Sequence, residues 1–392
     1  MSTALPLPAA RATRQGRLAV AAMFLANGFV MGSWAPQIPL LLPRHGIGTF
    51  TVGLLILMLG VGAVAAMALS GGLIARHGSR AVLRGFALPA SVTLAAVVLA
   101  PSLPLLTLAM VAMGALIGCM DVAMNANAVE VERRLGRAIM SSSHGFWSLG
   151  GFLGGGLGGG LIAAFGAGGH ALIASAVTLG VVALAAPFLT GDPPAPAPPG
   201  RRAPRTRRDA AIWIIGAMAL FSMVPEGAVL DWSALYLAQE LGAPVAASGL
   251  AFGFFAGAMA VMRFLGDAVR NRFGGVPTLR LSGAIGALGL LGASLAPTEA
   301  LAVACFALCG LGLANMVPIL LSAAGNHPGL GTGVGISTVT MLGYSGILVA
   351  PSSIGFVAEH IGFRVTFGVL ALLLLVVAAM ASRAAAADQT GG

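Results

Sequence analysis

The feature that most constrains this sequence is a series of apolar blocks, each about 20 residues long, separated by short clusters of glycine, proline and charged residues. A helix needs about 20 apolar residues to cross a hydrocarbon core of about 30 Å. The blocks lack the alternation of apolar and polar residues that marks a transmembrane β-barrel. Only 8% of the residues are charged, against about 25% in soluble domains, so we predict an all-α polytopic membrane protein.

Breaking the sequence at those clusters predicts twelve membrane-spanning helices. The first six cover residues 18–42, 52–75, 82–100, 103–129, 139–165 and 171–189, and the last six cover 211–238, 246–269, 279–296, 300–324, 331–358 and 363–381. The segment between the two sets is rich in proline and arginine, which favours an extended linker. The predicted organisation is a six-helix bundle of residues 1–190, a linker of residues 191–210 and a second six-helix bundle of residues 211–392.

The basic residues fix the predicted orientation. All 21 are arginine, so chemistry that needs a lysine, such as a P-loop phosphate site or a Schiff base, is excluded. A cytoplasmic N-terminus would place 18 arginines on the cytoplasmic face and 2 on the other, with Arg263 inside a span. The positive-inside rule therefore predicts a bacterial inner-membrane protein whose termini and linker are cytoplasmic. The net charge of +9 is a topology signal with some contact to anionic lipid, and we expect no nucleic-acid partner.

Neither a cofactor nor a metal site is expected. Cys119, Cys305 and Cys309 lie in apolar runs, far from any second pair of ligands. The glycine run 150–160 contains a formal GxGxxG, but no strand precedes it and it lies inside a span. Glycines repeat at every fourth position there and again at Gly249, Gly253 and Gly257, which favours close packing of two helices.

The two halves of the sequence also repeat. Four residues of one short loop recur 196 residues later, and so do two residues of a later span: Arg76, Gly78, Leu83, Arg84, Gly114 and Met120 recur as Arg272, Gly274, Leu279, Arg280, Gly310 and Met316. Two duplicated six-helix units are the plan of a rocking transporter, with its substrate site between the halves near the midplane.

These features resemble the Major Facilitator Superfamily over nearly the whole length. The loop 71–83 is similar to that superfamily's signature loop, and 267–274 is similar to its second copy. Both depart from the pattern, because Ala75 and Asn271 stand where it has an acid. Segments 121–127 and 226–236 resemble an uncharacterised bacterial inner-membrane group of the superfamily, loosely akin to sugar–proton symporters. The resemblance implies two pseudo-symmetric six-helix bundles, with Arg76, Gly78, Arg272 and Gly274 in the gating loops.

The resemblance also implies that the first, fourth, seventh and tenth spans line a central cavity. Polar residues gather in the same four spans: Asn27, Trp34 and Gln37; Asp121, Asn125 and Asn127; Glu226, Trp232, Ser233 and Tyr236; and Asn315. A buried acid or amide costs several kcal/mol in hydrocarbon unless it faces protein or water. We therefore expect this set to form the substrate-binding cavity.

Glu226 is the strongest candidate for proton coupling. It lies 15 residues into its span, a depth of about 22 Å at 1.5 Å per residue, beside Pro225 and Gly227, where the helix is expected to kink or unwind. A carboxylate at that depth could exchange a proton as the cavity changes sides; alternatively, it is a structural acid paired with an arginine. Asp121, with Asn125 one turn on, is the second coupling candidate, with a structural pair as its alternative. Asp231 is nearer the outer surface, which favours a gate or interfacial role.

Arg263 and Asp267 form an i,i+4 pair at the cytoplasmic end of the eighth span, which favours a conformational latch. In the resembled fold this end meets the start of the fifth span, residues 141–144, whose free backbone N–H groups attract a carboxylate. We predict that Asp267 binds there, held by Arg263, and favours the outward-facing state. His144 could titrate near neutral pH, although a structural role is the ordinary one for a single histidine at a helix start.

The sequence therefore predicts a secondary active transporter that moves a small polar or amphipathic solute by alternating access, with proton coupling and a sugar-like solute favoured. The alternatives are a drug or metabolite efflux transporter and a non-transporting membrane sensor or scaffold. An enzyme is not expected, because no nucleophile, base and orienting group converge by spacing. The expected partners are the solute, protons and the lipid bilayer, and the expected oligomeric state is a monomer.

Overall fold

The computed structural model describes residues 7–135, 139–191, 210–327 and 332–388; the side chains of several residues within these ranges, Asp267 among them, lie outside the described set. Over these residues the chain forms α-helices, short 3-10 segments and turns, with no strand. The all-α prediction is confirmed.

The N-terminal half crosses the molecule six times. Its elements are α1 (Leu7–Trp34), η1 (Ala35–Gln37), α2 (Ile38–His45), α3 (Thr49–His77), α4 (Ser79–Ala90), α5 (Thr93–Leu99), α6 (Leu103–Leu135), α7 (Met140–Ala185) and η2 (Ala186–Phe188). The first span consists of α1, η1 and α2, and the third consists of α4 and α5. The helix α7 reverses direction at Gly166, where φ is +72°, and so supplies the fifth and sixth spans.

The C-terminal half follows the same plan. Its elements are α8 (Ala210–Glu240), η3 (Val245–Ala247), α9 (Leu250–Phe273), α10 (Gly275–Leu295), α11 (Glu299–Leu313), α12 (Met316–Gly325), α13 (Thr332–Ala379) and η4 (Ala381–Asp388). Here α13 reverses at Gly362, where φ is +82°. The described chain holds 10 helices apolar and long enough to span a membrane, and the reversals at Gly166 and Gly362 turn this set into the predicted twelve spans.

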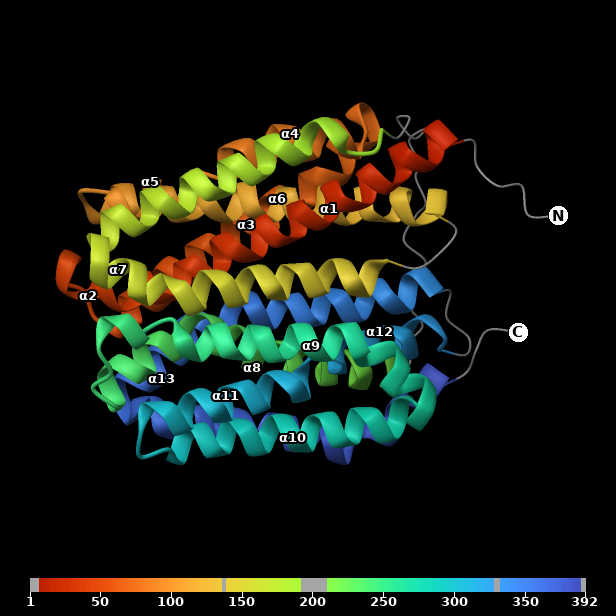
Figure 1. Cartoon of the computed structure of the whole chain (residues 1–392). Helices are drawn as coiled ribbons and strands as arrows, with labels where there is room; N and C mark the ends of the chain where they lie inside the picture. The colour runs from red at the N-terminus through yellow and green to blue at the C-terminus, as the bar shows by residue number, and fades with distance from the viewer. Residues whose placement is uncertain (1–6, 136–138, 192–209, 328–331, 389–392) are drawn as a thin grey trace.

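All spans run roughly along one direction, and both termini lie at the same end of the molecule (Figure 1). We call this the proximal end; it also contains the turns at Gly78 and Gly274. The distal end contains the turns at Gly46, Gly166, Gly242 and Gly362.

The backbone turns show that the two halves are copies of one unit. Among the described residues, six glycines have positive φ, and they form three pairs separated by 196 residues: Gly46 and Gly242, Gly78 and Gly274, and Gly166 and Gly362. The φ values within each pair agree, for example +62° and +64° for the first. A side chain with a Cβ is strained at such angles, so glycine is needed at each turn. The 196-residue repeat read from side chains is therefore also a repeat of backbone conformation.

Helix packing repeats with the same offset. Gly114 of α6 packs directly against the backbone of Leu59 in α3, and Gly310 of α11 packs against the backbone of Phe255 in α9. Each pair of partners is again 196 residues from the other. A Cβ at either glycine would overlap a carbonyl oxygen, so both close approaches need glycine.

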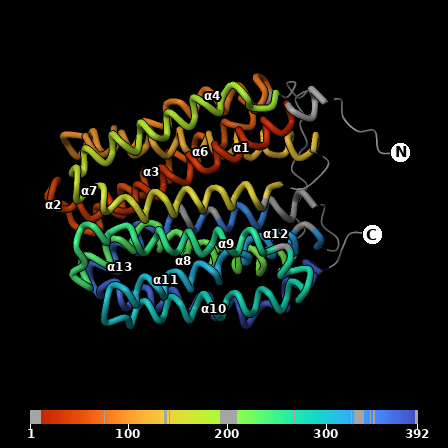
Figure 2. Tube along the Cα trace, in the orientation of Figure 1, coloured from red at the N-terminus to blue at the C-terminus, as the bar shows by residue number. Residues whose placement is uncertain are grey.

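The two halves lie one above the other in Figures 1 and 2 and meet mainly through α7 with α9 and α3 with α13. Gly155 of α7 faces the backbone of Gly249 and Gly253, and Gly159 faces the backbone of Val245 and Ala246. The prediction that the two glycine faces pack on each other across the half interface is confirmed.

The sequence predicts a kink or an unwound segment beside Glu226. The unwound segment is wrong, because α8 stays helical through Pro225 and Gly227. A proline removes only one backbone donor, and the rest of α8 is held by dense packing against α13.

Candidate functional site

An ion pair lies at the centre of the molecule, about half-way along α8. Arg263 Nη2 of α9 is 3.2 Å from Glu226 Oε1 of α8. The side chains of Arg263 and Glu226 are 16% and 27% exposed, although α8 packs against helices of both halves. Glu226 therefore faces the space between the halves instead of the interior of its own bundle.

Arg263 also connects the two halves. Its Nη1 donates to Ser148 Oγ of α7 over 2.7 Å, and Ser148 is fully buried. One guanidinium thus binds an acid of the C-terminal half and a hydroxyl of the N-terminal half. Pairing with an arginine is the structural alternative given above for Glu226, and the structure places that pair at the half interface, where a coupling residue would have to be. The described contacts of Arg263 leave the predicted latch untested, because the side chain of Asp267 lies outside the described residues.

On the N-terminal side, the helix face that holds Ser148 also holds His144 and Trp147. Trp147 Nε1 donates to Asn27 Oδ1 of α1 over 2.8 Å. The His144 ring lies edge-on to Phe24, with 5.1 Å between the ring centroids. These contacts attach α7 to α1 directly beside the hydroxyl that binds Arg263.

Asp121 and Asn125 lie on α6 and are partly exposed. The amide of Asn125 donates to the backbone carbonyl of Asp121 over 2.9 Å. The described contacts of these two residues do not include Glu226 or Arg263, so the structure does not bring the two coupling candidates together in one cluster.

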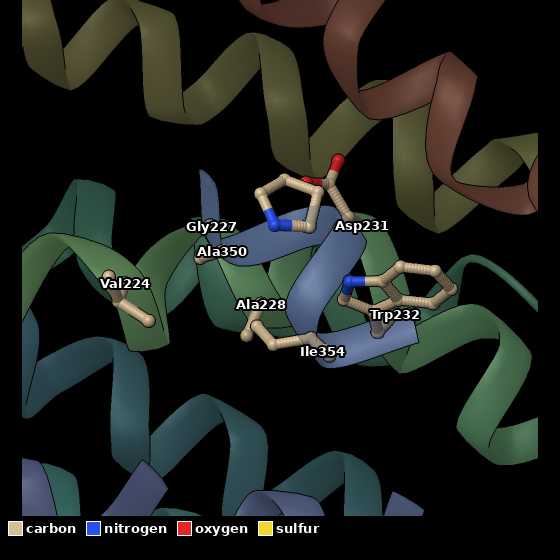
Figure 3. A pocket seen from close by; sticks show the side chains of 8 residues that line it. Val224, Gly227, Ala228, Asp231, Trp232, Ala350 and Ile354 are labelled. Atoms are coloured by element: carbon tan, nitrogen blue, oxygen red, sulfur yellow. The ribbon is translucent and has the colours of Figure 1, made fainter. Parts of the chain in front are cut away.

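A second polar layer lies distal to the ion pair. Trp34 and Trp232 are fully buried there, and Trp232 packs on Phe363 with 5.7 Å between ring centroids. Asp231 is 8% exposed and lines a small cavity beside Trp232 (Figure 3). The layer is closed by contacts between the halves, since Gly53 packs against the backbone of Pro351.

Several predicted cavity residues have their contacts inside one half. The Gln37 amide lies 2.7 Å from His170 Nδ1 and donates to the Ala167 carbonyl over 3.0 Å, which holds the end of the first span to the sixth. Tyr236 donates to the Ala293 carbonyl over 2.5 Å. Ser233 is fully buried, and Asn315 lies over Gly266 of α9, where a Cβ would overlap its side chain. Asn127 of the fourth span donates to Ser79 and to the Thr190 carbonyl.

The predicted gating loops lie at the proximal end. Gly78 and Gly274 both have positive φ, which ends α3 and α9 and lets the next helix begin at the following residue. Arg76 and Arg272 are exposed, and the Arg272 guanidinium lies over the ring of Phe273. Asp388 of η4 caps the start of α10 by accepting from the backbone of Gly275 and Val276.

Sequence reasoning missed three residues that join distant elements. Glu359 of α13 accepts from the Phe50 backbone N–H of α3 over 2.5 Å, a contact between the halves at the distal end. Glu132 accepts from the backbone of Ile139 at the start of the fifth span over 2.8 Å. Arg17 of α1 donates to Ser142 over 2.6 Å and to Ser143 over 3.3 Å. Glu132 follows the end of a predicted span and could have been tested as a cap, whereas the Glu359 contact joins residues 309 positions apart and leaves no local signal.

Two duplicated six-helix units with an ionic bridge between them match a known family. The sequence model of the Major Facilitator Superfamily matches residues 20–351. The chain belongs to this superfamily. It is 36% identical over 369 residues to an uncharacterised MFS-type transporter of Yersinia pestis, covering 91% of this chain and 93% of that protein. It is also 34% identical to the uncharacterised transporter y4wD of Sinorhizobium fredii (strain NBRC 101917 / NGR234), covering 92% and 96%.

Solved structures of the same superfamily share the fold. The nucleoside transporter NupG (D323A mutant) superposes with a TM-score of 0.74 at 13% identity, covering 94% of this chain and 99% of that one. A D-xylose–proton symporter superposes with a TM-score of 0.71 at 13% identity, covering 94% and 96%. The chain is thus an MFS membrane transporter of small molecules with the 12-helix fold of its family.

Proposed function

We propose that this transporter moves a small polar solute across the bacterial inner membrane by alternating access, coupled to protons through Glu226. The observation that carries the proposal is the bridge from Glu226 through Arg263 to Ser148, which joins the two halves at mid-depth. An acid, a fixed cation and the half interface meet at one place, and these are the parts that coupling needs.

The orientation supports the assignment of the captured state. The proximal end carries most of the described arginines, namely Arg76, Arg80, Arg84, Arg133, Arg134, Arg270, Arg272, Arg280 and Arg383, and the distal end carries Arg44 and Arg364. By the positive-inside rule the proximal end is cytoplasmic. Because the distal ends of the halves are in contact, we infer that the structure is closed on the distal, periplasmic side.

The coupling follows from the demands of a partly buried ion pair. Two charges taken out of water stabilise each other only while both are present and well paired. Protonation of Glu226 would remove its attraction to Arg263, and the guanidinium would then bind a solute oxygen or strengthen its bond to Ser148. Proton and solute would thus change the same contacts among Glu226, Arg263 and Ser148, and these contacts join the two halves.

The polar groups at this level favour a solute with several hydroxyl groups, in keeping with a sugar-like substrate. A carboxylate accepts hydrogen bonds from hydroxyls, and a guanidinium donates two parallel hydrogen bonds to their oxygens. Trp34 and Trp232 would stack on a ring only after the distal contacts open, because both indoles are fully buried here.

The test is solute exchange in proteoliposomes that contain a pH-sensitive dye, with a panel of monosaccharides and polyols. We expect wild-type protein to show counterflow and solute-induced proton flux. Glu226→Gln keeps the shape and one hydrogen-bond acceptor but cannot titrate, so counterflow should persist while proton flux is lost. Glu130→Gln, at the proximal surface beside Arg133 and Arg134, is the matched control.

Two results would contradict the proposal. Unchanged proton-driven accumulation in Glu226→Gln would remove Glu226 from coupling. Absence of exchange for every solute at every pH, with correctly folded protein, would favour the sensor or scaffold alternative, and proton-driven extrusion of amphipathic compounds would favour efflux.

A further inference from the structure

The distal cavity beside Asp231 is not part of the Glu226–Arg263 bridge. It lies between α8 and α13 and has a volume of about 10 Å³, room for about one water molecule. In Figure 3 the Asp231 carboxylate points from α8 towards the ribbons of the N-terminal half, and Trp232 lies beside the same cavity.

Two polar groups in this cavity have no partner within the described part of the chain. Asp231 is 92% buried and its carboxylate makes no described hydrogen bond or ion pair. Trp232 Nε1 is buried without a hydrogen-bond partner. Buried polar groups are almost always bonded; because the Trp232 nitrogen is closed to water, the Asp231 carboxylate is the group that can take a small ligand here.

The chemistry of the wall decides which ligand fits. The remaining wall includes Val224, Ala228, Pro351 and Ile354, which offer aliphatic carbon to the cavity. A metal cation needs several oxygen ligands, commonly six or more for Ca²⁺ and Mg²⁺, and one carboxylate does not supply them. A proton needs only the carboxylate, and the cavity has room for one water beside it.

Other charged groups on α8 and on the elements packed against it have their own described partners. On α8 and α9, Glu226 pairs with Arg263. At the distal end, Glu240 pairs with Arg364, Glu359 accepts from Phe50, His360 bonds the Phe356 carbonyl and Arg44 bonds the Val98 carbonyl. Glu299 of α11 and His45 of α2 are further titratable side chains of that end on elements packed against α8, and the His45 Nε2 is buried without a partner. None of these described contacts supplies a cation to Asp231.

We propose that Asp231 is a second proton-binding site of this transporter, holding a proton while the distal ends are closed. An ionised carboxylate with no cation and no hydrogen-bond donor in an aliphatic cavity is strongly disfavoured relative to its neutral form. The proposal rests on the proposed proton coupling for its purpose, but its geometry stands independently of transport.

The two acids on α8 have contrasting environments. Asp231 is five residues from Glu226, about 7.5 Å along the axis and about 140° around it. Glu226 faces a guanidinium, whereas Asp231 lies beside a cavity lined largely by aliphatic carbon. Proteins separate an acid that stays ionised from an acid that holds a proton by such a difference. Asp231 also lies under the distal contacts, where Gly355 packs on both Thr49 and Trp232, so separation of the halves would admit water to it.

The test is infrared spectroscopy of the purified full-length protein in a detergent that contains no carbonyl group, at neutral pH, with the proton itself as the probe. Wild-type protein should show the carbonyl stretch of a protonated carboxylic acid, and Asp231→Asn should lose that band. Glu226→Gln and Asp121→Asn, the matched acid-to-amide controls within spans, should keep it.

The outcomes separate this proposal from the proposed function. An Asp231→Asn spectrum that retains the full band, or a wild-type spectrum without one, would overturn the proton site whatever the transport assay shows. Loss of the band on replacing choline chloride with sodium chloride would identify a metal cation as the ligand and would also overturn it. If the band behaves as expected and Glu226→Gln still accumulates solute, the proton site stands and the role of Glu226 fails.

Discussion

The contact of Glu359 with the start of α3 predicts how the closed distal side is stabilised. The carboxylate accepts from the Phe50 N–H over 2.5 Å and lies within 3.3 Å of the point where a Cβ on Gly48 would stand. It therefore occupies the N-terminus of a helix of the opposite half, where free N–H groups and the helix dipole favour negative charge. Because the bond exists only while the distal ends touch, Glu359 should favour the inward-facing state.

The size of this stabilisation depends on how far the Glu359 carboxylate is exposed to solvent. An acid at an exposed helix N-terminus contributes roughly 0.3–1 kcal/mol, and Glu359 is exposed. Glu359→Gln keeps a hydrogen-bond acceptor but removes the charge, so it should lose most of that electrostatic energy. With RT of about 0.59 kcal/mol, the population with open distal ends should rise roughly two- to fivefold. The neighbouring contact of Phe50 with Phe356, with 5.8 Å between ring centroids, should remain.

The assay is the labelling rate of a cysteine at Ser352, where α13 packs against Gly53 of α3. The three native cysteines are replaced, and a membrane-impermeant maleimide is added from the distal side. Glu359→Gln should label about two to five times faster than the parent. Glu299→Gln is the matched control, because Glu299 lies at the same end but in the first turn of its own helix.

Equal rates in Glu359→Gln and the parent would refute the reasoning, and so would an equal increase in Glu299→Gln. The first result would mean that the contact carries no net energy, and the second that any loss of distal negative charge has the same effect.

Three further predictions follow from close contacts and helix ends. Gly159→Ala should lower the melting temperature in detergent by the equivalent of about 1–3 kcal/mol, because its Cβ would lie 2.7 Å from the Val245 carbonyl oxygen. Gly160→Ala is the control, because a Cβ there would meet no atom within 4 Å. It should leave the stability equal or raise it by up to about 1 kcal/mol. Asp388→Ala should destabilise by about 0.5–2 kcal/mol in the same measurement, because it removes the cap of α10, and an unchanged melting temperature would show that the cap contributes nothing. Asp267→Asn should increase the cytoplasmic accessibility of a cysteine at Ser142, because we predict that Asp267 stabilises the opposite, outward-facing state; unaltered accessibility would reject that latch.

The span organisation was predictable because it depends on local composition. Apolar length and glycine, proline and charge clusters sufficed for twelve spans, and the 196-residue repeat anticipated the paired turns. The unwinding of α8 at Pro225 was wrongly predicted, since local propensity at that dipeptide is weaker than the packing of the whole helix.

The sequence identified residues of the candidate site, but it did not predict which residues they contact. Glu226 and Arg263 were both singled out, yet spacing could suggest only pairs on one helix, and these two lie 37 residues apart on different helices. A central span also has protein on every side, so its polar residues need not face the cavity. Gln37 and Tyr236 bond inside their own halves, and no periodicity in their spans distinguishes that face from the interface.

Because the backbone is duplicated, each residue of the ion pair has an equivalent position in the other half. The positions equivalent to Glu226 and Arg263 in the first copy are Val30 and Met67, so the ion pair has no counterpart at these two positions of the first half. Both copies start from the proximal end, which puts the equivalent positions at the same depth. The two halves thus share a backbone repeat of 196 residues but carry different side chains at the positions of the ion pair.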